Sequence, residues 1–211
     1  LSDKLIVMSH EASDILKEIY AVPEDKIVFI HHGIADTPFI DPSFNKDKFG
    51  VEGKKVLLTF GLVSPNKGIE TVLQALPAVI KNHPDIVYIV LGATHPNVLK
   101  AHGDAYRIML QQLVRKLGIG AHVIFQNRFV EQMELWEYLG IADIYVTPYL
   151  NEAQITSGTL AYAMGAGKAI ISTPYWYATE MLAEGRGRIV PFSNPDAMAA
   201  QIVDLLDNHL D

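Results

Sequence analysis

The residues best suited to chemistry lie between two apolar runs, in the stretch YVTPYLNEAQITSGTLAYAMGAGKAIIS from Tyr145 to Ser172. The runs at its two ends, Ile144 to Thr147 and Ala169 to Ser172, are typical of buried strands, and the small residues of Gly158 to Gly165 predict a short helix between them. The loop TSGT, residues 156–159, enters this helix and leaves free backbone N–H groups at the positive end of the helix dipole. Ligands of open α/β sheets bind at the carboxyl ends of the strands. The stretch therefore predicts a site for a phosphate-bearing ligand.

A second loop of the same kind, GLVSPNKG from Gly61 to Gly68, follows the apolar run Val56 to Phe60 and precedes a helix expected from Gly68 to Asn82. Its glycines let the backbone approach a ligand closely, and Lys67 can direct a positive charge at an anion. The loop is not a P-loop, because its glycine, lysine and serine have the wrong spacing. From these residues alone, a capped turn with a solvated lysine explains the loop as well as a ligand site does.

Composition excludes several classes of protein. The chain of 211 residues is 49% hydrophobic and 19% charged, which suits one domain, or one domain with part of another. Its net charge of −7 argues against a general binder of nucleic acids or anionic membranes. It has no cysteine for a disulfide or a thiolate metal site, and no apolar run near the roughly 20 residues that span a bilayer. Leu1 is not a start methionine and no signal peptide precedes it, so we expect a piece of a longer protein. The lack of cysteines is compatible with a cytoplasmic location, and peripheral association of the full-length protein with a membrane stays open.

Strands and helices alternate along most of the chain, and the strands are continuous apolar runs rather than alternating ones. This pattern predicts an α/β fold with a Rossmann-like parallel sheet and helices on both faces. Besides the elements named above, we expect strands at Ile86 to Leu91, Val123 to Gln126 and Arg188 to Pro191, and helices at Ala105 to Leu117, Glu131 to Gly140, Thr179 to Ala183 and from Pro195 to Leu206 or beyond. A loop with His95 and Pro96 is expected before the helix at Ala105.

The first part of the chain predicts a separate strand-helix-strand unit. Leu5 to Met8 and Ile27 to Ile30 are short apolar runs, and Ser9 between them is a good N-cap for a helix. The polar segment Asp41 to Lys55 follows, and it is typical of a linker, so we predict a domain boundary there. The predicted domains are residues 1–45 and residues 46–211.

GLVSPNKGIETVLQAL resembles the glycine-arginine-leucine…lysine-glycine loop of retaining glycosyltransferases with the GT-B fold, of the family 4 (group 1) type. Three further stretches match this family in order and spacing: Phe125 to Val130, ADIYVTPYLNEAQ, and YAMGAGKAIISTPYWYATEML with GRGRIVPFSNPDAMA behind it. KLIVMSHEASDIL and KIVFIHHGIAD resemble the last strand-helix-strand of the family's N-terminal domain. The resemblance implies that residues 46–211 form the Rossmann-like C-terminal domain, which binds a nucleotide-diphosphate sugar. Residues 1–45 would then be a short remnant of the acceptor-binding N-terminal domain with the linker.

The resemblance also implies the reaction and its partners. A sugar would pass from a nucleotide-diphosphate donor to an unknown acceptor, in glycan or polysaccharide biosynthesis, with retention of the anomeric configuration. The acceptor, a glycan or a lipid, would bind to the missing N-terminal domain, and no nucleic acid, cofactor or bound metal ion would take part. The residues implied to contact the diphosphate, base or sugar of the donor are Gly61, Ser64, Lys67, Arg128, Phe129, Ser157, Gly158, Thr159, Tyr162 and Glu180.

One departure from the family concerns positive charge. Leu62 stands where the family has an arginine, so Lys67 lacks a cationic partner on the diphosphate. Arg128 could replace this charge, or it could simply extend over the surface. Glu180 lies where the family often has a glutamate that faces the donor, although a solvated carboxylate in the first turn of a helix explains it as well.

A second departure concerns two glutamates that the family has eight positions apart. Counting back from AMGAG places Gln154 and Tyr162 at these positions, whereas counting forward from Pro148 places the first on Glu152. We therefore predict Glu152 or Gln154 near the donor sugar as catalytic candidates. Tyr162 would act other than as a carboxylate that binds ribose hydroxyls.

Other functions stay open. The chain could be a glycosyltransferase-like binding module without catalysis, or a sugar-nucleotide epimerase with the GT-B fold. A phosphorylase would need a lysine for pyridoxal phosphate, and Lys168 at a strand start fits this role poorly. A nicotinamide enzyme fits least, because no G-x-G-x-x-G follows a strand. His31, His32 and the aromatic cluster Tyr175 to Tyr177 fit packing at least as well as ligand binding.

Overall fold

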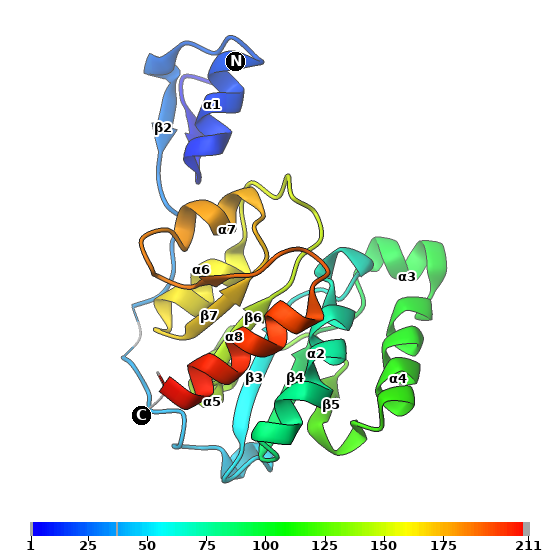
Figure 1. The fold of residues 1–211 in the computed structure, drawn as a ribbon. Coiled ribbons are helices and arrows are strands. Elements are labelled where there is room, and N and C mark those ends of the chain that lie inside the picture. The colour runs from blue at the N-terminus through cyan, green and yellow to red at the C-terminus, as the bar shows by residue number, and fades with distance from the viewer. Residues whose placement is uncertain (1, 37, 209–211) are drawn as a thin grey trace.

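The computed structural model describes residues 2–36 and 38–208, and its centre is a six-stranded parallel sheet (Figure 1). The strands stand in the order β5-β4-β3-β6-β7-β8. They are β3 (Lys55–Phe60), β4 (Ile86–Leu91), β5 (Val123–Gln126), β6 (Ile144–Thr147), β7 (Ala169–Ser172) and β8 (Arg188–Ile189). From β3 the chain moves outward through β4 to β5 and then returns to the other side of β3 at β6. The order therefore reverses between β3 and β6, and open α/β sheets bind ligands at such a switch point.

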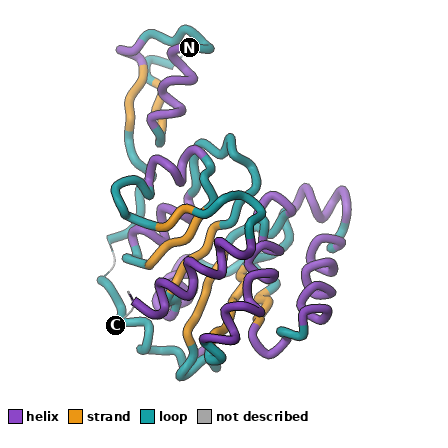
Figure 2. Tube along the Cα trace, viewed as in Figure 1, coloured by secondary structure: helices purple, strands orange, loops and turns teal. Residues whose placement is uncertain are grey.

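Helices cover both faces of this sheet (Figure 2). On one face lie α2 (Ile69–Asn82), α4 (Ala105–Leu117) and α8 (Pro195–Asn208), and on the other α5 (Gln132–Ile141), α6 (Gly158–Gly165) and α7 (Trp176–Met181). Successive side chains of a strand point to opposite faces, so Leu57 joins the first apolar core and Leu58 the second. Single turns of 3-10 helix lie at Glu24–Lys26, Asp47–Phe49, Pro65–Lys67 and Gly120–His122.

A small strand-helix-strand unit stands apart from the main sheet, at the top of Figure 1. In it β1 (Leu5–Val7) pairs in parallel with β2 (Ile27–Phe29), and α1 (His10–Glu18) connects them. The Ser9 hydroxyl accepts a hydrogen bond from the Ala12 amide and so caps α1. The unit therefore has the order of elements that the sequence predicts for it.

The whole segment between β2 and β3 is called the linker from here on, and it runs along α6 before it reaches β3. Its contacts depend on two glycines that leave room for it. A Cβ on Gly165 would lie 1.6 Å from the Cδ1 of Ile34, and a Cβ on Gly167 would lie 3.3 Å from the Phe39 ring. The small residues of the YAMGAGK segment thus form the surface on which the linker lies.

The predicted fold class is confirmed, and most strands and helices lie where the sequence predicts them. Two predictions were wrong. The segment with His95 and Pro96 is not a loop but forms α3 (Pro96–His102), whose start is capped by the His95 Nδ1, which accepts a hydrogen bond from the Asn97 amide. Likewise, α7 begins at Trp176 rather than at Thr179.

The division of the chain into domains at residue 45 stays a prediction. The outermost residues of the two predicted domains, 1 and 209–211, lie outside the described residues, as does residue 37. Among the helices that the structure describes, none has the length and apolar character needed to cross a membrane.

Candidate functional site

The loops that follow β3 and β4 touch at the carboxyl ends of these strands. The Gly61 amide donates to the Leu91 carbonyl (3.0 Å), and the Val63 amide donates to the Ala93 carbonyl (2.9 Å). Gly92 has a φ of +143°, and a Cβ there would lie 1.9 Å from the Gly61 carbonyl oxygen. Only glycine fits at this contact, so the loop that begins at Gly61 has a fixed position beside the strand ends.

The same loop is pressed against the segment that follows β6. Gly68 has a φ of +60°, and a Cβ there would lie 2.1 Å from the Pro148 carbonyl oxygen. The Leu150 amide donates to the Asn66 carbonyl at 2.9 Å. The two loops that the sequence identifies as candidate ligand loops therefore lie side by side, at the switch point of the sheet.

The second loop ends where α6 begins. Ser157 is the N-cap of this helix, and its hydroxyl accepts a hydrogen bond from a backbone amide of the first turn (3.3 Å). The Thr159 hydroxyl lies 3.1 Å from the Ser157 hydroxyl and 2.8 Å from the Tyr149 hydroxyl. A Cβ on Gly61 would lie 3.2 Å from the Thr159 methyl, so the helix start adjoins the first loop. The amides of Gly158 and Thr159 have no acceptor within the helix, as at any helix start, and can serve an anion.

Lys67 brings a positive charge to this corner of the molecule. Its Nζ lies 3.7 Å from the centroid of the Tyr149 ring. Ser64 begins the single turn that carries Lys67, and its carbonyl accepts a hydrogen bond from the Lys67 amide (2.9 Å). An ammonium group and a helix N-terminus on adjacent loops suit an anionic ligand.

An apolar hollow of about 220 Å³ opens beside Gly61. Its lining residues come from the ends of β3, β4 and β5 and from the first turns of α5 and α6: Phe60, Gly61, Leu62, Leu91, Gly92, Ala93, Arg128, Phe129, Val130, Leu135 and Thr159. The Phe129 ring is largely exposed. The Arg128 guanidinium pairs with the Glu134 carboxylate (Nη1 to Oε2, 2.8 Å), which raises the pKa of Arg128. Arg128 thus borders the hollow but already has a carboxylate partner.

Two of the predicted site residues have partners away from Lys67. The Tyr162 ring packs near Trp136 of α5 and His32 of the linker, with ring centroids 5.3 and 6.1 Å away. The Glu180 carboxylate accepts hydrogen bonds from the His10 amide at the start of α1 (2.9 and 3.1 Å). Glu180 therefore ties α7 to the N-terminal unit, and its contact with the donor stays a prediction.

The catalytic candidates Glu152 and Gln154 lie on the loop between β6 and α6. Glu152 is exposed, and its carbonyl accepts a hydrogen bond from the Trp176 amide (3.0 Å). The Gln154 side chain donates to the Thr156 carbonyl (2.7 Å), and its backbone carbonyl accepts from the Tyr177 amide (3.1 Å). The backbone of this loop is thus fixed to the start of α7, and the choice of catalytic residue between the two stays a prediction.

Two further residues lie at this site: Tyr149, which the sequence analysis does not single out, and His32, whose place at α6 it does not predict. Tyr149 lies between Lys67 and Thr159, and its only sequence signal is its place directly after a predicted strand. His32 lies at the start of α6, since a Cβ on Gly158 would be 3.0 Å from its Nε2. No signal in the sequence brings a linker histidine to that helix.

The aromatic cluster at the start of α7 packs inward. Tyr175 and Tyr177 are fully buried, so they cannot stack on a ligand, and Trp176 is half-buried. The Tyr177 hydroxyl has no hydrogen-bond partner among the described residues, and burial raises its pKa.

Replacing Tyr177 by phenylalanine is expected to leave the free energy of unfolding unchanged or to raise it by up to about 1 kcal/mol, because a buried hydroxyl without a partner loses its hydration and gains no bond. Urea unfolding would measure this change. Tyr88→Phe is the matched control: it removes a buried hydroxyl that donates to the Thr59 hydroxyl (2.8 Å) and should cost about 1 kcal/mol. Equal losses for the two variants would contradict the prediction.

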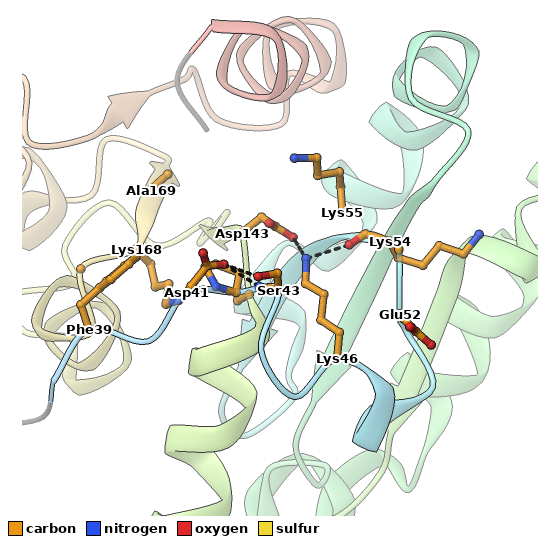
Figure 3. Close-up of a pocket in the computed structure, with 14 residues that line it drawn as sticks. Phe39, Asp41, Ser43, Lys46, Glu52, Lys54, Lys55, Asp143, Lys168 and Ala169 are labelled. Atoms are coloured by element: carbon orange, nitrogen blue, oxygen red, sulfur yellow. Dashed lines mark hydrogen bonds and ion pairs between the residues drawn. The ribbon is translucent and has the colours of Figure 1, made fainter. Parts of the chain in front are cut away.

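A larger hollow, of about 950 Å³, lies at the opposite end of the sheet, where β3, β6 and β7 begin (Figure 3). Lys46 of the linker points into this region, and its ammonium donates to the Asp143 carboxylate (2.7 Å) and to the Lys54 carbonyl (2.8 Å). Asp143 also accepts a hydrogen bond from the Val56 amide (2.6 Å). These bonds fasten the linker to the sheet, and we assign the hollow no ligand.

Lys168 lies at the same end of the sheet. Its ammonium donates to the Gly140 carbonyl (3.0 Å), and burial lowers the pKa of Lys168 to about 8. It precedes β7, whereas the ligand loops follow their strands, so Lys168 is at the wrong end of the sheet for a cofactor bound there. This position speaks against the phosphorylase alternative.

The sheet order, the two loops at its switch point and the helix that follows the second loop define a Rossmann-like domain of the kind that forms the C-terminal half of GT-B proteins. Residues 41–210 match the family described as "Glycosyl transferases group 1", and the chain belongs to this family. The group 1 resemblance of the sequence motifs is thereby confirmed.

Curated relatives fit this assignment. The chain is 32% identical over 171 residues to spore coat protein SA of Bacillus subtilis. The aligned region covers 77% of this chain and 42% of that protein. It is 27% identical over 176 residues to the phosphatidyl-myo-inositol mannosyltransferase of Mycolicibacterium smegmatis. The aligned region covers 82% of this chain and 40% of that protein. The chain thus spans less than half the length of these relatives.

Among solved structures, the crystal structure of Anabaena HepE in complex with UDP has the same fold. The TM-score is 0.80 at 20% identity, and the match covers 99% of this chain and 55% of HepE. At 20% identity, this similarity establishes a shared fold and carries no conclusion about a shared ligand.

Proposed function

We propose that this chain is the donor-binding part of a glycosyltransferase, which transfers a sugar from a nucleotide diphosphate to an acceptor in glycan or polysaccharide biosynthesis. The observation that carries the proposal is the Lys67 ammonium near the start of α6, together with the apolar hollow at Gly61 and Thr159. The ammonium and the helix start suit the two phosphates, and the hollow suits a base. The mannosyltransferase relative and the UDP held by HepE support the same class of ligand.

In the proposed reaction, the bond between the anomeric carbon of the sugar and the β-phosphate oxygen breaks. The nucleoside diphosphate leaves with the electron pair, and the anomeric carbon bonds to an acceptor hydroxyl oxygen, whose proton passes to the leaving phosphate. The product retains the anomeric configuration. Negative charge grows on the leaving phosphate, where the Lys67 ammonium and the amides of Gly158 and Thr159 would stabilise it. We propose no cofactor and no bound metal ion, since these groups take the place of one.

The remaining predicted residues divide between the two ends of the donor. Arg128 and Phe129 border the hollow, so we assign them to the base. Glu152 and Gln154 lie on the loop that ends at α6, so we assign one of them to the sugar. Tyr162 has aromatic neighbours on α5 and the linker, which fits a supporting role better than a direct contact with the ribose.

We further propose that an acceptor-binding domain packs on the unit of β1, α1 and β2. The apolar side chains of Ile6, Ile19 and Tyr20 are 64–71% exposed on this unit. A two-stranded sheet with one helix buries too little apolar surface to be stable alone, so these side chains suit a covering partner. We propose that this domain binds the acceptor, a glycan or a lipid, and that the protein reaches it from the cytoplasm.

Calorimetric titration with UDP, GDP and ADP tests the donor site. Saturable binding of one of them is expected, and Lys67→Ala should weaken it about tenfold or more, equivalent to about 1.4 kcal/mol. Lys81→Ala is the matched control, because Lys81 is an exposed lysine in the last turn of α2, about 20 Å along the helix from the site. Absence of binding, or an equal loss in both variants, would count against the proposal.

The non-catalytic alternative has one structural observation in its favour: the Gln154 amide is occupied by the Thr156 carbonyl. An assay of nucleotide-sugar turnover by the full-length protein distinguishes a transferase from a non-catalytic binding module. A donor domain of an enzyme would release nucleoside diphosphate from a nucleotide sugar at a rate that falls with Glu152→Gln. A binding module would retain the nucleotide sugar intact.

A further inference from the structure

Tyr149 has a fixed place between the two ligand loops. The ring is 4% exposed and stacks on the Tyr175 ring, with centroids 5.1 Å apart and an interplanar angle of 19°. The Tyr149 carbonyl accepts a hydrogen bond from the Thr173 hydroxyl (2.5 Å), and the next residue, Leu150, donates to the Asn66 carbonyl. Backbone and ring are thus both held, and the Tyr149 side chain has little freedom to move.

The ring of Tyr149 holds Lys67 without neutralising it. The Lys67 Nζ is 3.7 Å from the ring centroid, well within the range of a cation–π contact. Within residues 2–36 and 38–208, Lys67 forms no ion pair with a carboxylate. A carboxylate would cancel the charge of the ammonium, whereas an aromatic face leaves that charge available to an anion.

The hydroxyl of Tyr149 reaches the other half of the site. It lies 2.8 Å from the Thr159 hydroxyl, which in turn lies 3.1 Å from the hydroxyl of the N-cap Ser157. Burial raises the pKa of Tyr149, but the Lys67 ammonium and the hydroxyls of Thr159 and Ser157 outweigh it and hold this pKa below its ordinary value of 10. One side chain therefore contacts both the cation of the first loop and the start of α6.

We propose that Tyr149 is a positioning residue for the diphosphate of the donor: its ring places the Lys67 ammonium and its hydroxyl places the Thr159 hydroxyl, so that the two loops bind the phosphates as one unit. This inference rests on the proposed donor-binding function. It assigns to Tyr149 an effect on phosphate binding that depends on Lys67, beyond its contribution to packing.

The test is a double-mutant cycle on the 211-residue chain, with UDP, GDP and ADP and the matching nucleosides uridine, guanosine and adenosine as probes. Tyr149→Leu should weaken binding of the diphosphate about tenfold, and Tyr149→Phe, which keeps the ring, about threefold or less. Neither variant should change nucleoside binding. In the Lys67→Met background, Tyr149→Leu should weaken binding no more than Tyr149→Phe does with Lys67 present, because the cation that the ring positions is gone and only the hydroxyl contact to Thr159 is lost.

A second measurement examines Lys67 in the free chain. Reductive methylation with ¹³C-formaldehyde gives each lysine an NMR signal, and Lys67→Met identifies the one from Lys67. Its signal should carry a ring-current shift in the wild-type chain and in Tyr149→Phe, and lose it in Tyr149→Leu. Tyr138→Leu, another buried tyrosine that packs on Phe49, is the control for general destabilisation.

The outcomes separate the inference from the function on which it rests. If none of UDP, GDP and ADP binds to the wild-type chain, the proposed function falls and the inference falls with it. If a diphosphate binds, three results would overturn the inference alone: unchanged affinity in Tyr149→Leu, an equal loss for nucleoside and diphosphate, or losses that add fully in the Lys67→Met background. An unchanged Lys67 signal in Tyr149→Leu would also overturn it.

Discussion

Replacing Asp143 by alanine is expected to lower the free energy of unfolding by about 3–5 kcal/mol. The Asp143 carboxylate and the Lys46 ammonium are 2.7 Å apart, with side chains only 9% and 8% exposed. Asp143 also accepts the Val56 amide at the start of β3. Alanine would leave a buried ammonium without its counter-charge and a buried amide without its acceptor. Urea unfolding followed by circular dichroism would measure the loss.

An exposed ion pair provides the control for Asp143. The Lys48 ammonium lies 2.6 Å from the Glu137 carboxylate, but their side chains are 57% and 42% exposed. Glu137→Ala should therefore cost no more than about 1 kcal/mol, because water screens such a pair. A cost for Asp143→Ala as small as that for Glu137→Ala would show that the Lys46–Asp143 pair is not desolvated.

A double variant tests the physical cause of the loss. In Lys46→Met with Asp143→Asn no charge is buried, and the asparagine oxygen can still accept the Val56 amide. This variant should be more stable than Asp143→Ala, since removing both members of a buried pair costs less than stranding one of them. If it is no better, loss of packing between linker and sheet, rather than a stranded charge, explains the effect.

The core of the fold is predictable because its signal is local. Ile86–Leu91 and Val123–Gln126 are continuous apolar runs, and such runs between helices imply a parallel sheet covered on both faces. The missed helix α3 shows the limit of this signal. Pro96–His102 buries none of its residues, so it has no apolar stripe, and its cap is a histidine rather than one of the common capping residues.

The candidate site is predictable only in the part that depends on sequence order. Lys67 and Ser157–Thr159 follow strands, and a parallel sheet brings the ends of its strands to one edge. The place of Tyr149 could not be predicted, because a tyrosine next to an apolar run is equally typical of the core. Its contact with Lys67 arises because Gly68 packs without a side chain against the Pro148 carbonyl, which is a tertiary property.

Replacing Gly92 by alanine is expected to be as damaging as the loss of Asp143, at about 3–5 kcal/mol. Gly92 has a φ of +143°, which strains any residue with a Cβ, and the new methyl group would lie 1.9 Å from the Gly61 carbonyl oxygen. The Gly61 carbonyl oxygen cannot easily move away, because hydrogen bonds hold the backbone on both sides of the contact. The Gly61 amide donates to the Leu91 carbonyl (3.0 Å), and the Gly92 amide donates to the Gln126 carbonyl (2.9 Å). Relief requires the loop after β3 to move off the strand ends. The variant should therefore lose nucleoside diphosphate binding as well as stability, measured by calorimetry and urea unfolding.

Gly118→Ala separates backbone strain from steric contact in this prediction. Gly118 ends α4 with a φ of +68°, and a Cβ there would meet nothing within 4 Å. Its replacement should cost about 1 kcal/mol, from the left-handed backbone alone, with ligand binding unchanged. The difference between the two variants then measures how tightly the backbone at Gly61 is pressed against Gly92. If Gly92→Ala costs no more than Gly118→Ala and still binds the nucleotide, the strand ends tolerate movement, and nucleotide binding does not depend on the fixed position of the Gly61 loop.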